Sequence, residues 1–235
     1  MTSGWDQSAD AWIASLGEAG DWGRQFVLDR PMLVGAIRGR PAAALDVGCG
    51  EGRFCRMLAG EGVKAIGIDP TERLIEEARL RDPSGDYRVG RAELLDFPDA
   101  SFDLVVSYLS LIDIEAVETA IAEMARVLRP GGALLIAHLN GFATAAEPDG
   151  WRRGPDGALR FSFDRYLDAR ATDVGWRGIR VVNWHRPLSF YFKALFAAGL
   201  DLTLFDEPEP HGGSPDKFDR YRRAPHFCLM RWEKR

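Results

Sequence analysis

The sequence predicts an α/β fold with a mostly parallel β-sheet and helices on both faces. Two observations support this prediction. Apolar runs of strand length alternate with stretches of helical periodicity through the middle of the chain, which is the pattern of repeated βαβ units. The run at 101–109 is apolar almost throughout, as in a strand that is covered on both faces. Hydrophobic residues make up 46% of the 235 residues, which is enough for a packed core.

Residues 41–140 hold the regular part of this pattern. Strands are expected at 42–47, 63–69, 86–92, 101–109 and 133–140. Helices are expected at 53–62, 70–81 and 115–129. Pro70 stands at a helix start, where proline is favoured, and Pro130 with the glycine pair after it ends the third helix.

Residues 1–40 precede the core with two stretches of helical periodicity that no core strand requires. We expect them to form an N-terminal helical cover. Residues 141–186 lose the alternation and become rich in glycine, proline, arginine and aromatic residues. We expect this segment to be a cap inserted after the fifth strand, with a hairpin formed by 159–167 and 178–184.

Residues 187–235 return to the pattern of the core. A helix is expected over 186–200, followed by strands at 201–207 and 226–232 that complete the sheet. The polar segment between those strands is expected to be an exposed loop. We expect the cover, core, cap and completing strands to form a single domain over 1–235.

The composition narrows the range of partners. A net charge of −5 argues against a nucleic-acid-binding surface, because such surfaces usually carry a concentrated basic patch. No apolar stretch approaches the roughly 18 residues of a membrane helix, and the first residues lack the basic and apolar regions of a signal peptide. We therefore expect a cytoplasmic protein that binds neither nucleic acid nor membrane. We expect it to be a monomer or a homodimer.

Cysteine and histidine are sparse and irregularly spaced. Cys49, Cys55 and Cys228 suit neither a disulfide framework nor a zinc site, so reduced thiols are expected. The four histidines show no helical i, i+4 pair of the kind that favours a metal. We assign no metal to this chain.

The segment AALDVGCGEGRF, residues 43–54, places three alternating glycines directly after the first expected strand. Gly48 and Gly50 begin a dinucleotide-type motif, but Arg53 occupies the third position that this motif requires. A P-loop is a still poorer match, because no Gly-Lys-Ser or Gly-Lys-Thr follows. The glycine pattern alone therefore leaves the ligand open.

Two carboxylates help to decide between the ligands. Asp46 stands immediately before the loop, where a negative charge is unfavourable beside a pyrophosphate and favourable near an ammonium or sulfonium. Asp69 ends the second expected strand, about 20 residues after Gly50, which suits an acid that bonds both hydroxyls of a ribose. Together they favour a cationic nucleoside over a phosphorylated one.

Four segments resemble, in order and at the usual spacing, the motifs of class I S-adenosylmethionine-dependent methyltransferases: LDVGCGEGRF, IGIDPTERLIEEAR, AELLDFPDASFDLVVS and ARVLRPGGALLIA. The resemblance covers roughly 41–140. It implies a Rossmann-like sheet of seven strands, mostly parallel, whose last-inserted strand is antiparallel. It also implies S-adenosyl-L-methionine as the cofactor, and methyl transfer by in-line displacement to an oxygen or nitrogen of a small-molecule acceptor.

Carried over position by position, the resemblance also implies a set of residues around the methionine part of the cofactor. That part would lie over Gly48, Cys49 and Gly50, with Asp46 behind its amino group. Ser107, at the end of the fourth expected strand, would lie near the same amino group. Arg24, in the N-terminal cover, is a candidate for the cofactor carboxylate, and an ordinary surface salt bridge is the alternative for this arginine.

The nucleoside part has its own implied residues. Asp69 would bind the ribose, with Pro70 beside it. The family commonly places an aspartate opposite the adenine amino group, and this chain has Arg91 there instead. We therefore assign adenine binding to the backbone of Ala92 and the side chain of Glu93, which as a solvated acid has a purely structural alternative.

Three residues are candidates for acid–base work on the acceptor. His185, between the cap and the following helix, has the pKa range of a general base, although a histidine at such a junction also serves in local hydrogen bonding. Tyr108 and His138 stand near the carboxyl ends of strands, where α/β sheets bind ligands. Cys49 is an alternative nucleophile, but we prefer its role as a small residue between two glycines.

Two other functions remain open at this point. The first is an NAD(P)-dependent oxidoreductase, against which the displaced third glycine argues. The second is a catalytically silent partner subunit that keeps the cofactor-binding fold.

Overall fold

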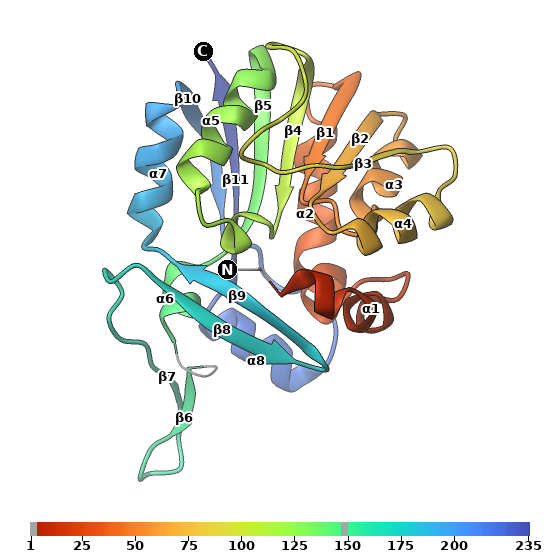
Figure 1. Ribbon diagram of the computed structural model, residues 1–235. Coiled ribbons are helices and arrows are strands. Elements are labelled where there is room, and N and C mark those ends of the chain that lie inside the picture. Colours follow the sequence, from red (N-terminus) through yellow and green to blue (C-terminus); the bar gives the residue numbers. More distant parts are fainter. Residues whose placement is uncertain (1–3, 147–149) are drawn as a thin grey trace.

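The computed structural model describes residues 4–146 and 150–235, and its central element is a seven-stranded sheet (Figure 1). The strands are β1 (Ala43–Val47), β2 (Lys64–Asp69), β3 (Asp86–Val89), β4 (Phe102–Tyr108), β5 (Leu128–Leu139), β10 (Leu200–Asp206) and β11 (Phe227–Lys234). They lie in the order β10-β11-β5-β4-β1-β2-β3. Strand β11 is antiparallel to both of its neighbours, and the other pairs are parallel. The Rossmann-like fold is thus confirmed.

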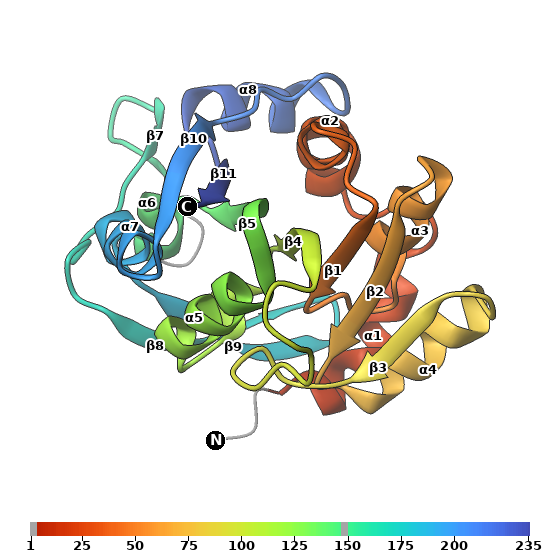
Figure 2. The same ribbon diagram turned by 90° about the horizontal axis from the view of Figure 1, so that it is seen from above.

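The part of the chain that the structure describes contains eight α-helices. They are α1 (Trp5–Leu16), α2 (Asp29–Ile37), α3 (Arg53–Gly60), α4 (Glu72–Arg81), α5 (Val117–Val127), α6 (Gly141–Ala145), α7 (Leu188–Ala197) and α8 (Pro215–Arg223). Helices α5 and α7 pack on one face, and α2 and α3 pack on the other, as the view from above shows (Figure 2). Alternate residues of each strand face the two layers: Leu45 joins the cluster of α5, and Ala44 joins that of α2.

The N-terminal segment has two separate positions in the structure. A π-helical turn, Arg24–Leu28, leads into α2, whose Met32 and Ala36 are completely buried against the sheet. Helix α1 instead lies beyond the end of the sheet (Figure 1). Only α1 is therefore a cover in the sense that the sequence predicted. Residues 1–3 of that expected cover and 147–149 of the expected cap lie outside the described residues.

The inserted cap contains two hairpins, and the predicted pairing of 159–167 with 178–184 is wrong. The observed strands are β6 (Trp151–Arg153), β7 (Leu159–Phe161), β8 (Arg170–Trp176) and β9 (Ile179–His185), and they pair as β6 with β7 and β8 with β9. Arg177 and Gly178, both with positive φ, form the two-residue turn between β8 and β9. Such turns match the twist of an antiparallel pair, so the nearest neighbours in sequence pair.

Two further boundaries differ from the expected ones. Helix α5 ends at Val127, and β5 already begins at Leu128, so Pro130 lies at an irregular strand start rather than at a helix end. This position is one that sheets tolerate for proline. The polar segment expected as a loop contains α8, none of whose residues is buried. Phe218 and Tyr221 are its two large apolar side chains, among charged neighbours, so hydrophobic periodicity indicates this helix only weakly.

Candidate functional site

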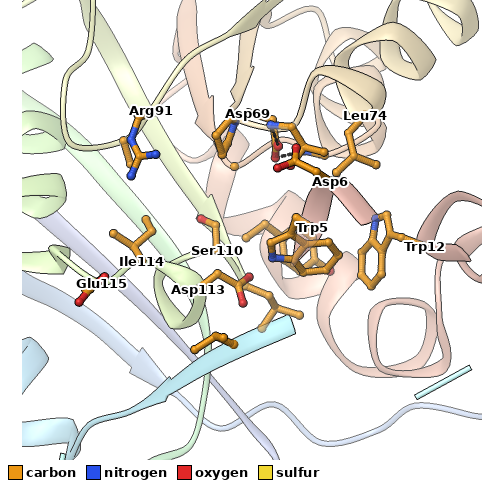
Figure 3. Close-up of a pocket in the computed structure, with 18 of the residues that line it drawn as sticks. Trp5, Asp6, Trp12, Asp69, Leu74, Arg91, Ser110, Asp113, Ile114 and Glu115 are labelled. Carbon is orange, nitrogen blue, oxygen red and sulfur yellow. Dashed lines mark hydrogen bonds between the residues drawn. The ribbon is translucent and has the colours of Figure 1, made fainter. Parts of the chain in front are cut away.

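A cavity of about 460 Å³ lies at the carboxyl ends of the parallel strands (Figure 3). This volume falls within the range of about 300–1,000 Å³ that is typical of small-molecule sites. The loops after β1, β2, β3 and β4 form its floor, and α1 and the β8–β9 hairpin close it. A small adjoining hollow of about 50 Å³ shares Trp12, Arg24, Gly48, Gly50 and Tyr108 with the cavity.

The glycine loop brings backbone close to the cavity. Gly48 and Gly50 have φ of 79° and 56°, in the left-handed region that favours glycine. A Cβ on Gly48 would lie 2.4 Å from the Cβ of Ser110, so the loops after β1 and β4 touch there. A Cβ on Gly50 would meet only the Nε1 of Trp12, at 3.8 Å. Gly50 therefore leaves space beside the backbone on the cavity side.

Asp69, the residue expected to bind a ribose, lines the cavity, and backbone N–H groups hold its carboxylate in place. Its Oδ2 accepts a hydrogen bond from the N–H of Gly50 at 3.0 Å, and its Oδ1 accepts one from the N–H of Thr71 at 2.9 Å. Burial raises the pKa of this carboxyl, against the lowering effect of these hydrogen bonds. Each carboxylate oxygen can accept a further hydrogen bond from a ligand hydroxyl.

Asp46 does not line the main cavity but reaches the adjoining hollow, together with Cys49. Its Oδ2 accepts a weak hydrogen bond from the thiol of Cys55 at 3.6 Å. Its buried Oδ1 has no hydrogen-bond partner among the described residues. Burial raises the pKa of this carboxyl to about 7. A cationic group in the hollow would satisfy this oxygen.

Arg24 lies where the cavity and the hollow meet. Its guanidinium donates to Asp21 at 2.5 Å and lies over the rings of Trp12 and Tyr108, at 4.9 and 5.4 Å from their centroids. These contacts fix a cation between two aromatic faces. Arg24, the candidate for binding the cofactor carboxylate, thus lies beside the glycine loop.

Tyr108 lines the cavity with its ring but not with a free hydroxyl group. The hydroxyl donates a hydrogen bond to Oδ1 of Asp29 at 2.8 Å. Burial raises the pKa of this phenol well above its ordinary value. The structure therefore contradicts its assignment as an acceptor-side base, because its proton is bonded away from the site.

The two predicted catalytic histidines are also placed differently from expectation. His185 does not line the cavity: its Nδ1 lies 2.6 Å from the hydroxyl of Thr144 and its Nε2 lies 2.9 Å from the carbonyl oxygen of Tyr166. Both ring nitrogens are therefore in use, and burial lowers the pKa of the ring. His138 is buried against the ring of Tyr191, at 4.4 Å between centroids, and burial lowers its pKa to about 3. Neither residue is retained as a base.

Ser107 is completely buried and does not itself line the cavity. Its Oγ lies 2.7 Å from the Oγ of Ser110, which donates to the carbonyl oxygen of Val47 at 2.6 Å. Ser110, three residues further on, is the serine that faces the cavity. Cys49 is likewise buried, and burial raises the pKa of its thiol well above the ordinary value, which argues against a nucleophile.

The loop after β3 lines the cavity as expected. Pro70, Ala92 and Glu93 all contribute to the lining. Glu93 is ion-paired with Arg91, whose Nη2 lies 3.1 Å from its Oε1. The acidic side chain next to the predicted adenine position is therefore neutralised by the arginine that departs from the family pattern.

Several lining residues were missed by the sequence reasoning. They are chiefly Trp5, Trp12, Ser110, Asp113, Ile114, Glu115 and Trp184. Asp113 belongs to a 3-10 helix, Leu111–Asp113, and accepts a hydrogen bond from Asn183 at 2.6 Å. Burial raises the pKa of its carboxyl to about 8. Its position shortly after β4 is the one signal that could have identified it, because ligands collect at such strand ends.

The cover over the site joins two segments that are distant in sequence. Ser8 of α1 donates a hydrogen bond to the carbonyl oxygen of Arg180 in β9, and accepts one from the same residue's N–H, both at 3.0 Å. Helix α1 brings Trp5 and Trp12 to the cavity, and the hairpin brings Trp184. Their docking is a tertiary contact that no local pattern encodes.

Two negative observations apply to residues 4–146 and 150–235. Within them, no three histidine, cysteine or acidic side chains are grouped closely enough to hold a metal ion. No helix in this part of the chain has both the length and the apolar character needed to span a membrane.

Comparison with known proteins places this site in context. The profile of a family described as "Methyltransferase domain" matches residues 45–136. Demethylmenaquinone methyltransferase of Renibacterium salmoninarum is 33% identical over 128 residues, which are 54% of this chain and 52% of the relative. Malonyl-[acyl-carrier protein] O-methyltransferase of Enterobacter lignolyticus is 29% identical over 195 residues, 83% of this chain and 76% of the relative. This chain spans about half the length of curated relatives such as the first of these.

The solved structures agree on the fold. An S-adenosylmethionine-dependent methyltransferase from Mesorhizobium loti superimposes with a TM-score of 0.75 at 24% identity, over 97% of this chain and 98% of the other. At this identity the likeness concerns the fold. The family profile covers the glycine loop from Leu45, and also Asp69 and the loop after β4.

Proposed function

This chain belongs to the class I S-adenosylmethionine-dependent methyltransferases, and on that premise we propose that it transfers a methyl group to an oxygen or nitrogen of a small-molecule acceptor. S-adenosylmethionine is its cofactor. Two curated relatives are named for small or carrier-bound acceptors, demethylmenaquinone and malonyl-[acyl-carrier protein]. A cavity of about 460 Å³ beneath a cover is of a size that suits a metabolite.

The observation that carries the proposal is the set of polar groups around the glycine loop. Asp46 keeps a buried oxygen without a partner beside the hollow, and this oxygen suits the cofactor's ammonium group. Arg24, at the same hollow, suits the carboxylate. Asp69 has acceptor capacity left on both oxygens, which suits the two ribose hydroxyls. The residues present therefore fit the cofactor.

The remaining assignments follow from the same arrangement. We propose that the backbone at Gly48 and Gly50 lies against the methionine part, and that Pro70, Ala92 and Glu93 border the nucleoside. Cys49 contributes its backbone to this loop, and its buried thiol contributes no chemistry. Ser110 takes the place beside the loop that the sequence reasoning had given to Ser107.

Positioning is the main task that this chemistry leaves to the protein. When bound, S-adenosylmethionine supplies a methyl group on a positively charged sulfur, which is already an activated electrophile. The chain's residues then have to hold the acceptor in line and exclude water. Trp5 and Trp12 of α1 and Trp184 of the hairpin close the cavity and so exclude water from it.

A labelling experiment tests this function. The purified protein is incubated with methyl-tritiated S-adenosylmethionine and a dialysable extract of small molecules, with the Asp69→Ala variant as the control. We expect label in the small-molecule fraction with the wild-type chain and a loss of at least about tenfold with the variant, because two charge-assisted hydrogen bonds are removed. Label that appears only in protein or nucleic acid would contradict the proposal.

A further inference from the structure

We propose that the acceptor is a protonated amine, and that Asp113 is the carboxyl group that binds its nitrogen and takes its proton. This inference rests on the proposed function and narrows the acceptor atom from oxygen or nitrogen to nitrogen. It is carried by three features of the cavity: an excess of unpaired carboxyl groups, flanking tryptophans, and the fixed position of Asp113.

The first feature is the charge of the lining. Five acids line the cavity, Asp6, Asp69, Glu93, Asp113 and Glu115, against two arginines, Arg24 and Arg91. Both arginines already have acidic partners, Asp21 and Glu93 respectively.

The remaining acids therefore lack cations of their own. Within the part of the chain that the structure describes, no basic side chain forms an ion pair with Asp6, Asp113 or Glu115. The proposed cofactor contacts use Asp46 and Asp69. This leaves three carboxyl groups for the acceptor, and such a surface favours a cation over a neutral or anionic molecule.

The second feature is the aromatic wall on the same side. Figure 3 shows Trp5 and Asp113 next to each other, and Trp184 also lines this cavity. The ring of Trp5 is held edge-on against Trp12, at 5.2 Å between centroids. Tryptophan is the aromatic residue that attracts cations best.

A buried arginine, Arg186, holds Trp184 in position. The guanidinium of Arg186 lies 4.8 Å from the ring centroid of Trp184. The same group donates hydrogen bonds to the carbonyl oxygens of Ile114 and Glu115, at 3.0 and 2.7 Å. Arg186 is thus a positioning residue that ties the cap to the loop carrying Asp113.

The third feature is the placement of Asp113 itself. The side-chain amide of Asn183 donates to its Oδ1 at 2.6 Å, and Trp5 also donates a hydrogen bond to this carboxyl. Because each carboxylate oxygen can accept two hydrogen bonds, Oδ2 can still accept one from a ligand. Asn183 belongs to the cap and Asp113 to the core, so the bond sets this carboxyl at the junction of the two. An ammonium group at Oδ2 would lie among the tryptophans and the other acids.

The proton step balances without any further reactant. The N–H bond of the bound ammonium breaks, its electron pair stays on nitrogen, and the proton bonds to the carboxylate of Asp113. The nitrogen then carries the free pair that methyl transfer requires.

The surroundings of Asp113 support this role. Burial and the charge of Asp69 raise its pKa, hydrogen bonds from Asn183 and Trp5 and the charge of Arg24 lower it, and the net value is about 8. Asp6 and Glu115 line the same cavity, and Tyr191 is close enough for the charge of Asp113 to act on its hydroxyl group. In the ligand-free protein at pH 7 the carboxyl is therefore mostly protonated. An ammonium ligand favours the carboxylate, so its binding releases a proton to solvent.

Matched pairs of amines and alcohols test the proposal. Phenethylamine with 2-phenylethanol, tryptamine with tryptophol, and hexylamine with hexanol are titrated calorimetrically at pH 7 into protein saturated with S-adenosylhomocysteine. Each titration is run in two buffers of different ionisation enthalpy, which reveals proton release. We expect at least one amine to bind at least tenfold more tightly than its alcohol, with proton release.

Variants separate the role of Asp113 from a structural one. Asp113→Asn is expected to weaken amine binding at least tenfold and to abolish the proton release, while its affinity for S-adenosylhomocysteine stays unchanged. Asp113→Glu restores part of the amine binding. Glu118→Gln, an exposed change of the same charge on α5, is expected to behave as wild type.

The outcomes also separate this inference from the proposed function. If wild-type protein fails to bind S-adenosylhomocysteine, the proposed function itself falls. Three other outcomes would overturn only the amine proposal. The wild-type protein could bind S-adenosylhomocysteine but no amine of the set, or it could prefer the alcohols. Alternatively, Asp113→Asn could bind the amine with unchanged affinity and proton release.

Discussion

Single residues determine the chemistry of this site mainly through buried carboxyl groups. Asp46 and Asp69 are buried and Asp113 is half-buried; all three lie at the carboxyl ends of strands or just beyond them, and removal from water raises the pKa of each. A carboxyl group held out of water destabilises the ligand-free protein unless a partner is supplied. A cationic ligand is such a partner. We therefore expect these carboxyl groups to make the site favour positively charged ligands.

Replacement of Asp46 by asparagine tests this idea at one position. The folded-state pKa of about 7 lies above the unfolded value of 3.8, so the folded protein keeps a proton that the unfolded chain loses between these two values. Stability of the ligand-free protein therefore falls as the pH rises through this window. Each pKa unit is worth about 1.36 kcal/mol, so Asp46→Asn is expected to gain roughly 1–4 kcal/mol at pH 8 and little at pH 4.

Urea unfolding at the two pH values measures the effect of this substitution. Asp206→Asn, at an exposed position of β10, serves as the matched control and is expected to change stability by less than about 0.5 kcal/mol. The same Asp46 variant should bind S-adenosylhomocysteine more weakly at pH 8. Equal destabilisation of Asp46→Asn at both pH values would refute the account of this buried carboxyl.

The structure places the predicted residues beside the cavity where a motif fixes the backbone, and places His138 and His185, which were chosen for residue type, away from it. The positions of Gly48, Gly50 and Asp69 follow from the strand-turn-helix pattern, which places them at one edge of the sheet. His138 lies away from the cavity because it is on the same face of β5 as Leu134 and Ile136, which pack under α5 and α7. The ionisable character of its side chain does not determine which face of the strand the residue is on.

At the scale of elements, the cover consists of α1 and the β8–β9 hairpin. These segments are joined by the two hydrogen bonds between Ser8 and the backbone of Arg180. Gly4 at the start of α1 also lies against this strand, because a Cβ there would come within 2.3 Å of the carbonyl oxygen of Arg180. The closed position of α1 therefore depends on a few specific contacts at one end of the helix.

Substitution of Ser8 by alanine is expected to loosen this cover. It removes both hydrogen bonds and leaves the backbone N–H and carbonyl groups of Arg180 without this partner, at a cost of about 1 kcal/mol. We expect S-adenosylhomocysteine to dissociate faster, with an affinity loss of about threefold to tenfold, measured by stopped-flow fluorescence of the tryptophans. Ser15→Ala is the control, because that hydroxyl bonds only within α1, to the carbonyl oxygen of Trp12. Equal dissociation rates in the two variants would contradict a role for the Ser8 contact.

The regular elements of the core were predictable because their patterns are local. Each βαβ unit shows its apolar run and its amphipathic helix within about 30 residues. The cap was predicted to exist but was paired wrongly, since the turn at Arg177 and Gly178 is marked by only one glycine. The contact of α1 with β9 joins residues that are far apart in sequence, and no periodicity indicates it.

At the scale of the whole molecule, the strand order explains why the site forms where it does. The parallel strands β1, β2, β3 and β4 end at the same edge of the sheet, so their following loops meet around one cavity. The antiparallel β11 lies between β5 and β10, and with α7 it completes the core on the far side. We propose that the four predicted parts of the chain fold as one domain around this sheet.

We propose that this cavity binds S-adenosylmethionine through Asp69 and the glycine loop. Calorimetric titration with the product, S-adenosylhomocysteine, tests it most directly, with Asp69→Ala and NAD as comparisons. We expect one-to-one binding to the wild-type protein and no heat with NAD. We expect at least tenfold weaker binding to Asp69→Ala, because each lost charge-assisted hydrogen bond is worth about 1.5–3 kcal/mol. Absence of S-adenosylhomocysteine binding by the folded wild-type protein, or binding of NAD instead, would contradict it.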